Sequence, residues 1–195
     1  QTPYYKYDKG GDYHYDVISA FIKSVRGSDP QAAVYYLAQM LLSGEDPKFI
    51  ARRLVILAAE DIGLADPQAL VLANACFDVI HKIGMPEARI PLSETTIYLA
   101  LADKSNTAYL AIGEAYRAVR EQGPQGVPLH LQDATKKKLG KIEANYLYPH
   151  DEETTWVAQD YLPEALRGSS FYHGKQNGRE KELLERWERR VMKKT

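Results

Sequence analysis

Hydrophobic residues recur at three- and four-residue steps through the first two thirds of the chain, which is the spacing of one face of an α-helix. The first such series is Tyr15, Ile18, Ile22 and Val25. It predicts a helix over 15–26 that buries one apolar stripe and ends at Gly27. The alternation of apolar and polar residues that would indicate strands is scarce, so the pattern predicts an all-α fold.

Three Asp-Pro pairs predict the starts of the next three helices. They are Asp29-Pro30, Asp46-Pro47 and Asp66-Pro67. An Asp side chain accepts hydrogen bonds from the first free amides of a helix, and Pro is tolerated at the first helical position because its missing N–H would be unpaired there. About one helix length later each segment reaches a glycine, at Gly44, Gly63 or Gly84, where a left-handed cap is commonly needed. The spacing therefore predicts one helix between each pair and its glycine.

Two more helices, over 91–102 and 105–121, complete a predicted helical body at residues 15–121. From Gln122 onward Gly, Pro and scattered aromatic residues replace the helical spacing, which predicts a loop-rich wrap over 122–178.

A last, strongly charged helix is predicted over 179–193, and residues 1–14 are predicted to be a connector. We expect one domain over 1–195: a helical bundle with an irregular, loop-rich C-terminal third.

The charge balance and the cysteine count exclude several classes of protein. The 25 Lys and Arg residues nearly equal the 26 Asp and Glu residues, so the chain has no strong overall field for nucleic acid. The single cysteine, Cys76, excludes an internal disulfide and a Cys-rich zinc site, and it fits a reducing, intracellular setting. The sequence contains no phosphate-binding P-loop and no metalloprotease motif. The residues themselves predict no catalytic, cofactor-binding or metal-binding site.

Two charge pairs inside one predicted helix are candidates for interface residues. Arg52 and Arg53 precede Glu60 and Asp61 by about two helical turns in an otherwise apolar segment. Adjacent carboxylates on a helix point about 100° apart, which disfavours acid–base catalysis. Two interpretations remain open: plain structural residues with one member of each pair in water, or ion pairs across a subunit contact, where Arg can hold a carboxylate with two hydrogen bonds.

A lysine cluster is the candidate contact for nucleic acid, and it consists of Lys136, Lys137, Lys138 and Lys141. Nearby tyrosines, Tyr146 and Tyr148, could stack on single-stranded bases while the lysines contact phosphates. The last predicted helix is also basic, but glutamates interleave with its arginines. We therefore expect a solvated face with internal ion pairs there.

Several stretches of the chain together resemble a known family. They are YDKGGDYHYDVISAFIKSVRGSDPQAAVYYLAQMLLSGEDPKFIARRLVILAAEDIGLADPQAL, GMPEARIPLSETTIYLALADKSNTAY, VPLHLQDA, YLYPHD and QDYLPEAL. In this order they resemble the C-terminal half of the replication-associated recombination protein A family (RarA, also called MgsA), which includes relatives of the Werner helicase-interacting protein. The resemblance covers nearly the whole chain.

The resemblance implies a function for this region and for the longer protein around it. Family members are AAA+ ATPases related to clamp loaders that act at stalled replication forks and assemble as homotetramers through this region. The implied fold is an all-α oligomerisation domain similar to the clamp-loader collar. ATP and Mg²⁺ are expected to bind in an ATPase module upstream of Gln1, to which 1–14 would connect, so this fragment is expected to be no enzyme and to hold no cofactor.

The sequence thus predicts a tetramerisation domain of a DNA-dependent AAA+ ATPase in replication-fork maintenance and recombination. The expected partners are copies of the chain itself, DNA through the full-length protein, and single-stranded DNA-binding protein or other replication proteins. No membrane partner is expected, and the expected location is the bacterial cytoplasm at the nucleoid. The alternative is a DNA- or protein-binding helical module that uses the cluster from Lys136 to Lys141.

Overall fold

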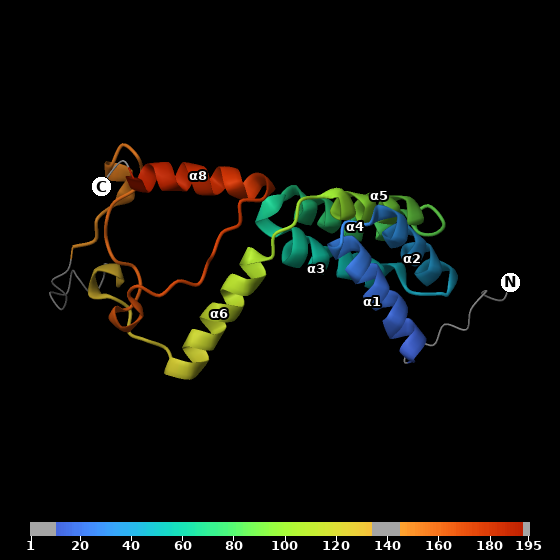
Figure 1. The fold of residues 1–195 in the computed structure, drawn as a ribbon, viewed down its shortest axis with the longest axis horizontal. Helices are drawn as coiled ribbons and strands as arrows, with labels where there is room; N and C mark the ends of the chain where they lie inside the picture. The colour runs from blue at the N-terminus through green and yellow to red at the C-terminus, as the bar shows by residue number, and fades with distance from the viewer. Residues whose placement is uncertain (1–10, 134–144, 193–195) are drawn as a thin grey trace. The chain divides into compact units, whose positions relative to one another are not determined.

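The structure is a computed structural model that describes residues 11–133 and 145–192. These residues form helices, turns and loops and contain no strand, which confirms the all-α prediction. The helices are α1 (Asp12–Arg26), α2 (Pro30–Leu42), α3 (Pro47–Leu57), α4 (Gln68–Ile83), α5 (Arg89–Leu101), α6 (Thr107–Gln122) and α8 (Gly178–Met192) (Figure 1).

The chain divides into two compact units. The first unit contains residues 1–109 and 175–181, and the second unit contains residues 110–174 and 182–195. Helices α6 and α8 each begin in the first unit and continue into the second. The expectation of a single domain over the whole chain stays a prediction.

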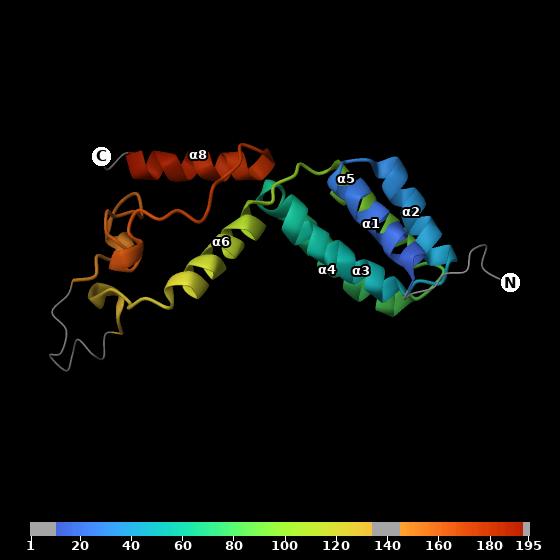
Figure 2. The same cartoon turned by 60° about the horizontal axis from the view of Figure 1, so that its bottom comes forward.

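The first unit is a bundle of five helices around one apolar core. Helix α1 packs on α2, α2 on α5, α5 on α4 and α4 on α3, so the bundle closes around side chains from all five (Figures 1 and 2). Helix α1 contributes Val17, Phe21 and Val25, whose four-residue spacing places them on one helix face. The largest fully buried apolar side chains in the other helices are Met40, Ile50, Leu54, Leu57, Leu92 and Leu99.

The Asp-Pro pairs begin helices as the sequence predicted. The Oδ1 atom of Asp29 accepts a hydrogen bond from the backbone N of Ala32 at 3.0 Å, and Oδ1 of Asp46 accepts one from the N of Lys48 at 3.0 Å. At the third pair, Oδ1 of Asp66 accepts from the N of Gln68 at 3.1 Å. These bonds satisfy amides that would otherwise lack a partner inside the helix.

The helix predicted from Pro47 to Gly63 changes form before it ends. Helix α3 stops at Leu57, a π-helical turn covers Ala58–Ile62, and a 3₁₀ turn covers Gly63–Ala65. Gly63 has φ of 50°, and a Cβ atom there would lie 2.8 Å from the backbone oxygen of Ser105. The backbone N of Ser105 in turn donates to the oxygen of Asp61 at 2.8 Å. The close passage of a later segment is the physical reason for the change, and spacing along the sequence does not reveal it.

The second unit has less regular secondary structure than the first. Between α6 and α8 its described residues contain three short 3₁₀ turns, at Leu129–Leu131, Pro149–Asp151 and Glu164–Leu166, joined by loops. This agrees with the predicted irregular C-terminal third. Where the structure describes this unit, none of its residues is buried.

Candidate interface surfaces

Helix α6 carries a stripe of apolar side chains that one copy of the chain leaves open to solvent. The stripe is Tyr109, Ile112, Tyr116 and Val119, and each of these side chains is at least 54% exposed. Their spacing of three, four and three residues places them along one helix face. Only Thr107, the first residue of the helix, is buried. A helix of this length is marginal in water without a packed face, so the α6 stripe is a candidate interface.

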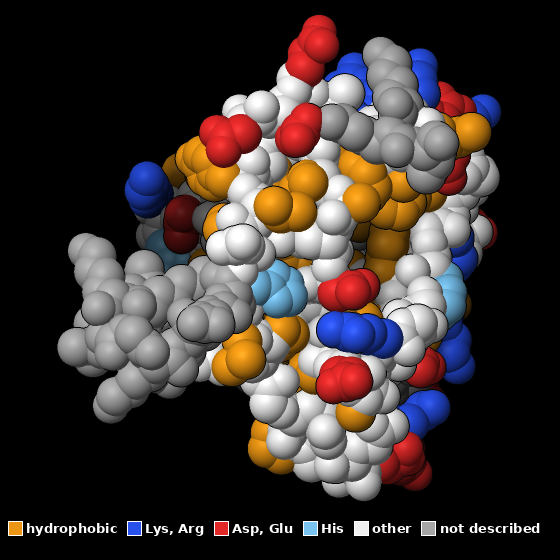
Figure 3. All heavy atoms as spheres, turned by 90° about the vertical axis from the view of Figure 1, so that its left-hand side faces the viewer, with side chains coloured by type: hydrophobic (Ala, Val, Ile, Leu, Met, Phe, Trp, Pro, Cys, Tyr) orange, Lys and Arg blue, Asp and Glu red, His pale blue; other side chains and the backbone are white. Residues whose placement is uncertain are grey.

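Other parts of the second unit also expose apolar side chains. On α8 these are Leu183, Trp187 and Met192, and in the loops they include Val127, Leu129, Tyr146, Leu147, Tyr148, Tyr161 and Tyr172. Figure 3 shows hydrophobic side chains at the surface, between charged ones, on the face around the C-terminal end of α8. Single exposed apolar residues are ordinary, but so many within one region are typical of an interaction surface.

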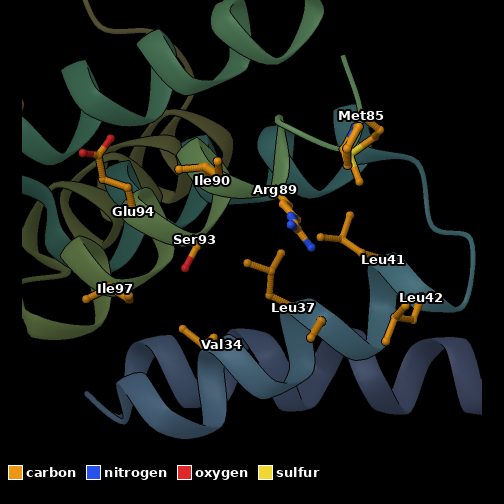
Figure 4. Close-up of a pocket in the computed structure, with 12 residues that line it drawn as sticks. Val34, Leu37, Leu41, Leu42, Met85, Arg89, Ile90, Ser93, Glu94 and Ile97 are labelled. Atoms are coloured by element: carbon orange, nitrogen blue, oxygen red, sulfur yellow. The ribbon is translucent and has the colours of Figure 1, made fainter. Parts of the chain in front are cut away.

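The first unit has an apolar groove between α2 and α5 with a volume of about 760 Å³. Leu37 and Leu41 on α2 face Arg89 and Ser93 on α5 across this groove (Figure 4). The other residues that line it are Val34, Ala38, Leu42, Met85, Pro86, Ile90, Glu94 and Ile97. Most of the lining is apolar and several side chains are widely exposed, so the α2/α5 groove is a second candidate interface.

A buried carboxylate holds the starts of α6 and α8 together within the first unit. Glu180 is 0% exposed, and its two carboxylate oxygens accept hydrogen bonds from the hydroxyl of Ser105 at 2.5 Å and from that of Thr107 at 2.6 Å. Asn177 Nδ2 donates to the backbone oxygen of Lys104 at 2.9 Å beside this cluster. We call this set of contacts the Glu180 clasp. Hydrogen bonds to a charged acceptor are stronger than neutral ones, so the clasp fixes where both helices begin.

A glycine allows the clasp to form. Gly178 has φ of 52°, and a Cβ atom at this position would lie 2.5 Å from the backbone oxygen of Ala65 and 3.0 Å from Oδ2 of Asp103. Any side chain would therefore push the first turn of α8 away from the bundle. The close approach and the left-handed backbone both require glycine here.

The structure places one of the four predicted interface residues in an ion pair within the chain. Asp61 is buried and accepts hydrogen bonds from Arg26 Nε at 2.8 Å and Nη2 at 3.3 Å. The hydrogen bond to Asp61 raises the pKa of the Arg26 guanidinium, with burial acting in the opposite direction. Spacing along the sequence does not indicate this pair, because its members are far apart in the chain and lie on different elements.

The other three predicted interface residues do not come together. Glu60 is partly exposed and Arg52 is exposed. The Nε atom of Arg53 is buried and has no hydrogen-bond partner among the residues that the structure describes. None of the ion pairs within the described part of the chain joins Arg52 or Arg53 to Glu60 or Asp61. Their role at a subunit contact stays a prediction.

A buried contact between a histidine and a carboxylate, which the sequence did not indicate, lies at the start of α1. His14 Nδ1 lies 3.1 Å from Glu45 Oε2, and both side chains are almost fully shielded from solvent. This pair joins the first helix to the loop before α3. His14 belongs to the segment YDKGGDYHYD, of which only the part after Gly10 is described.

The predicted nucleic-acid residues Lys136, Lys137, Lys138 and Lys141 lie outside the described residues. Within 11–133 and 145–192, no three His, Cys, Asp or Glu side chains gather closely enough to hold a metal ion. Among the helices of the same ranges, none combines the length and apolar character needed to cross a lipid bilayer.

The chain matches two families that are described as C-terminal regions of AAA proteins. Residues 1–26 match a family described as an AAA C-terminal domain, and residues 27–191 match one described as the MgsA AAA+ ATPase C terminal. The chain therefore belongs to the MgsA AAA+ ATPase C-terminal family.

Named relatives support this membership over almost the whole chain. The chain is 45% identical to replication-associated recombination protein A of Bacillus subtilis, with 100% of this chain and 46% of the relative aligned. For the protein of the same name in Escherichia coli the identity is 37%, over 93% of this chain and 41% of the relative. ATPase WRNIP1 of Dictyostelium discoideum is 43% identical over 87% of this chain and 20% of its own length. The chain thus spans less than half the length of these relatives.

Proposed function

We propose that this chain is the tetramerisation domain of a DNA-dependent AAA+ ATPase that maintains replication forks and supports recombination. Family membership supports the ATPase and recombination context, because the aligned relatives carry those names. One observation supports self-association most directly: no described residue of the second unit is buried in a single copy. Such a unit gains little hydrophobic stabilisation alone and needs neighbouring copies to remove its apolar surface from water.

The two candidate interfaces fit a closed assembly of four. A tetramer with dihedral symmetry uses two different kinds of two-fold contact. The chain offers two separate apolar surfaces, the α6 stripe and the α2/α5 groove. In the proposed tetramer each surface lies in one kind of contact.

Light scattering on the purified chain tests the assembly. At tens of micromolar the mass should equal four copies of 22.0 kDa. Ile112→Glu places a charge within the α6 stripe and should reduce the particle to dimers. Ile90→Glu, in the groove, should also give dimers, and the double variant should give monomers, because a buried unpaired charge is strongly unfavourable.

Arg117→Glu is the matched control for the α6 variant. Arg117 is exposed on the other side of the same helix, where it forms a weak contact of 3.8 Å with Glu114. The Arg117→Glu substitution changes the net charge by more than Ile112→Glu does, yet the measured mass should stay that of a tetramer. A monomeric unmodified chain, or equal dissociation by Arg117→Glu and Ile112→Glu, would contradict the proposal.

The remaining expectations rest on the family and concern the longer protein. ATP and Mg²⁺ would bind in an ATPase module outside this chain, and the chain alone would neither hold a cofactor nor hydrolyse ATP. The tetramer would place four such modules on DNA, where single-stranded DNA-binding protein and other replication proteins would meet it. We expect this to take place in the bacterial cytoplasm, at the nucleoid. ATP turnover by the purified chain would contradict the division of roles.

A further inference from the structure

A basic cavity lies within the second unit, between α8 and the loop after the 3₁₀ turn at Pro149–Asp151. Its volume is about 490 Å³, and it is lined by Glu153, Thr154, Arg186, Arg189 and Arg190. The three arginines lie three and four residues apart on α8 and therefore share one face of the helix. Three guanidinium groups against one carboxylate give the cavity an excess of positive charge.

These arginines have no carboxylate partner in the described part of the chain. The sequence predicted ion pairs with the interleaved glutamates of the last helix. However, none of the ion pairs within 4.0 Å involves Arg186, Arg189 or Arg190. The prediction of internal pairs is therefore wrong for these three residues. Their hydrogen-bond donors are available to an anion, and planar guanidinium groups match the geometry of phosphate oxygens.

Two neighbouring residues fit a nucleic acid better than a small anion. Trp187 is 50% exposed and lies three residues before Arg190, so the two are neighbours on the helix surface. An exposed indole beside arginines can stack on an unpaired base while the arginines hold the phosphates. Thr154 lines the same cavity, and its hydroxyl has no hydrogen-bond partner among the described residues.

We infer that this cavity, the α8 arginine site, binds the phosphodiester backbone of single-stranded nucleic acid, with Trp187 stacking on a base. The site goes beyond self-association and requires only one copy of the chain. It also differs from the lysine cluster at Lys136 to Lys141. The two contacts proposed for the tetramer, the α6 stripe and the α2/α5 groove, include neither Trp187 nor these arginines, so the assembly does not require their burial.

Fluorescence anisotropy with a labelled oligothymidylate of about 20 nucleotides tests the site on the whole 195-residue chain. Three arginine contacts should make the logarithm of the affinity fall with the logarithm of salt with a slope of about −2, since each contact to a single strand contributes about −0.7. Arg189→Glu should weaken binding about tenfold or more, and Trp187→Ala about fivefold or more. Arg186→Gln, which removes a charge without reversing it, should weaken binding and lower the slope by about 0.7.

Lys181→Glu is the matched control, because it reverses the same charge on the opposite side of α8. It should change the affinity less than about twofold. Circular dichroism and light scattering of each variant separate loss of the site from loss of fold or assembly, so the tetramer proposal can fail while this one stands.

Four outcomes would overturn the assignment. The first is no binding at low salt, and the second is an equal loss for Arg189→Glu and Lys181→Glu. The third is displacement of the oligonucleotide by polyglutamate at equal charge concentration in the unmodified chain, which would identify an acidic protein segment as the ligand. The fourth outcome concerns inorganic phosphate, which should displace the oligonucleotide only at much higher concentration than a second oligonucleotide does. Equal potency of the two competitors would identify a small-anion site instead.

Discussion

The two units of this chain differ in whether they bury side chains of their own. In the first unit α1 to α5 bury a continuous core, and every buried side chain that the structure describes belongs to this unit. The second unit contains most of α6 and α8, joined by loops and short 3₁₀ turns, and where described it has no buried residue. Secondary structure alone therefore does not make a stable unit: the first unit has a core of its own, and the second has none in a single copy, which is why we propose that other copies cover it.

Removal of a core side chain from the first unit should have the largest effect. Phe21 is 1% exposed, and Phe21→Ala should lower the free energy of unfolding by about 3–5 kcal/mol because a large cavity remains. The control Tyr35→Ala removes an aromatic side chain that is 61% exposed in the same bundle and should cost about 0.5 kcal/mol. Urea unfolding followed by far-ultraviolet circular dichroism measures both. Equal costs would contradict the conclusion that a buried core stabilises the first unit.

The Glu180 clasp tests where the first unit ends. Glu180→Gln keeps the shape of the side chain but removes the charge that strengthens the bonds from Ser105 and Thr107, so it should cost about 1.5–3 kcal/mol. Glu188→Gln makes the same change at an exposed position of α8 and should stay within about 0.5 kcal/mol. Urea midpoints of the two variants give the comparison. If Glu180→Gln is as mild as Glu188→Gln, the start of α8 is not part of the first unit's stable structure.

In alkaline solution we expect a smaller loss of stability, which arises from two residues of the first unit. Burial raises the pKa of the Cys76 thiol above its ordinary value of 9.0, and the hydrogen bond from Tyr98 to Asp66 raises the pKa of that phenol above 10.0. The folded chain therefore keeps both protons at a pH where the unfolded chain has lost them. The free energy of unfolding should fall as pH rises past 9.0 and fall further past 10.0.

Single variants separate these contributions to the pH dependence. Cys76→Ala should remove the first part of the fall, and Tyr98→Phe the second, in urea titrations from neutral to alkaline pH. Burial lowers the pKa of Lys104 and acts in the opposite direction, so each contribution is read from its own variant. A stability that rises with pH in the Cys76 range would contradict the assignment.

The sequence predicted the helices well because their signals are local. The Asp-Pro pairs and the three- and four-residue spacing act within one or two turns, and apart from the end of α3 at Leu57 the observed helices begin and end within a few residues of the predicted ones. The π-helical turn at Ala58–Ile62 was missed since its cause, the approach of Ser105 to Gly63, involves residues far apart in the chain.

The candidate site was less predictable for the same reason. Asp61 was predicted as a possible subunit-interface residue, and the structure shows it paired within the chain with Arg26, which is on another helix and was not named. The arginines of the last helix were expected to pair with neighbouring glutamates, yet side-chain geometry left Arg186, Arg189 and Arg190 facing a cavity. Spacing along the sequence indicates which charged side chains are close enough to form an ion pair, whereas the packing of the folded chain determines which ion pairs form.

The Glu180 clasp joins the two points at which the chain leaves the five-helix bundle and returns to it. Thr107 and Glu180 are hydrogen-bonded at 2.6 Å, so the chain departs from the helical bundle and re-enters it at one point. Because both ends of the intervening segment are held at this point, a change in its length should leave the bundle intact. Replacement of this whole segment by a short glycine-rich linker should likewise leave a folded five-helix bundle.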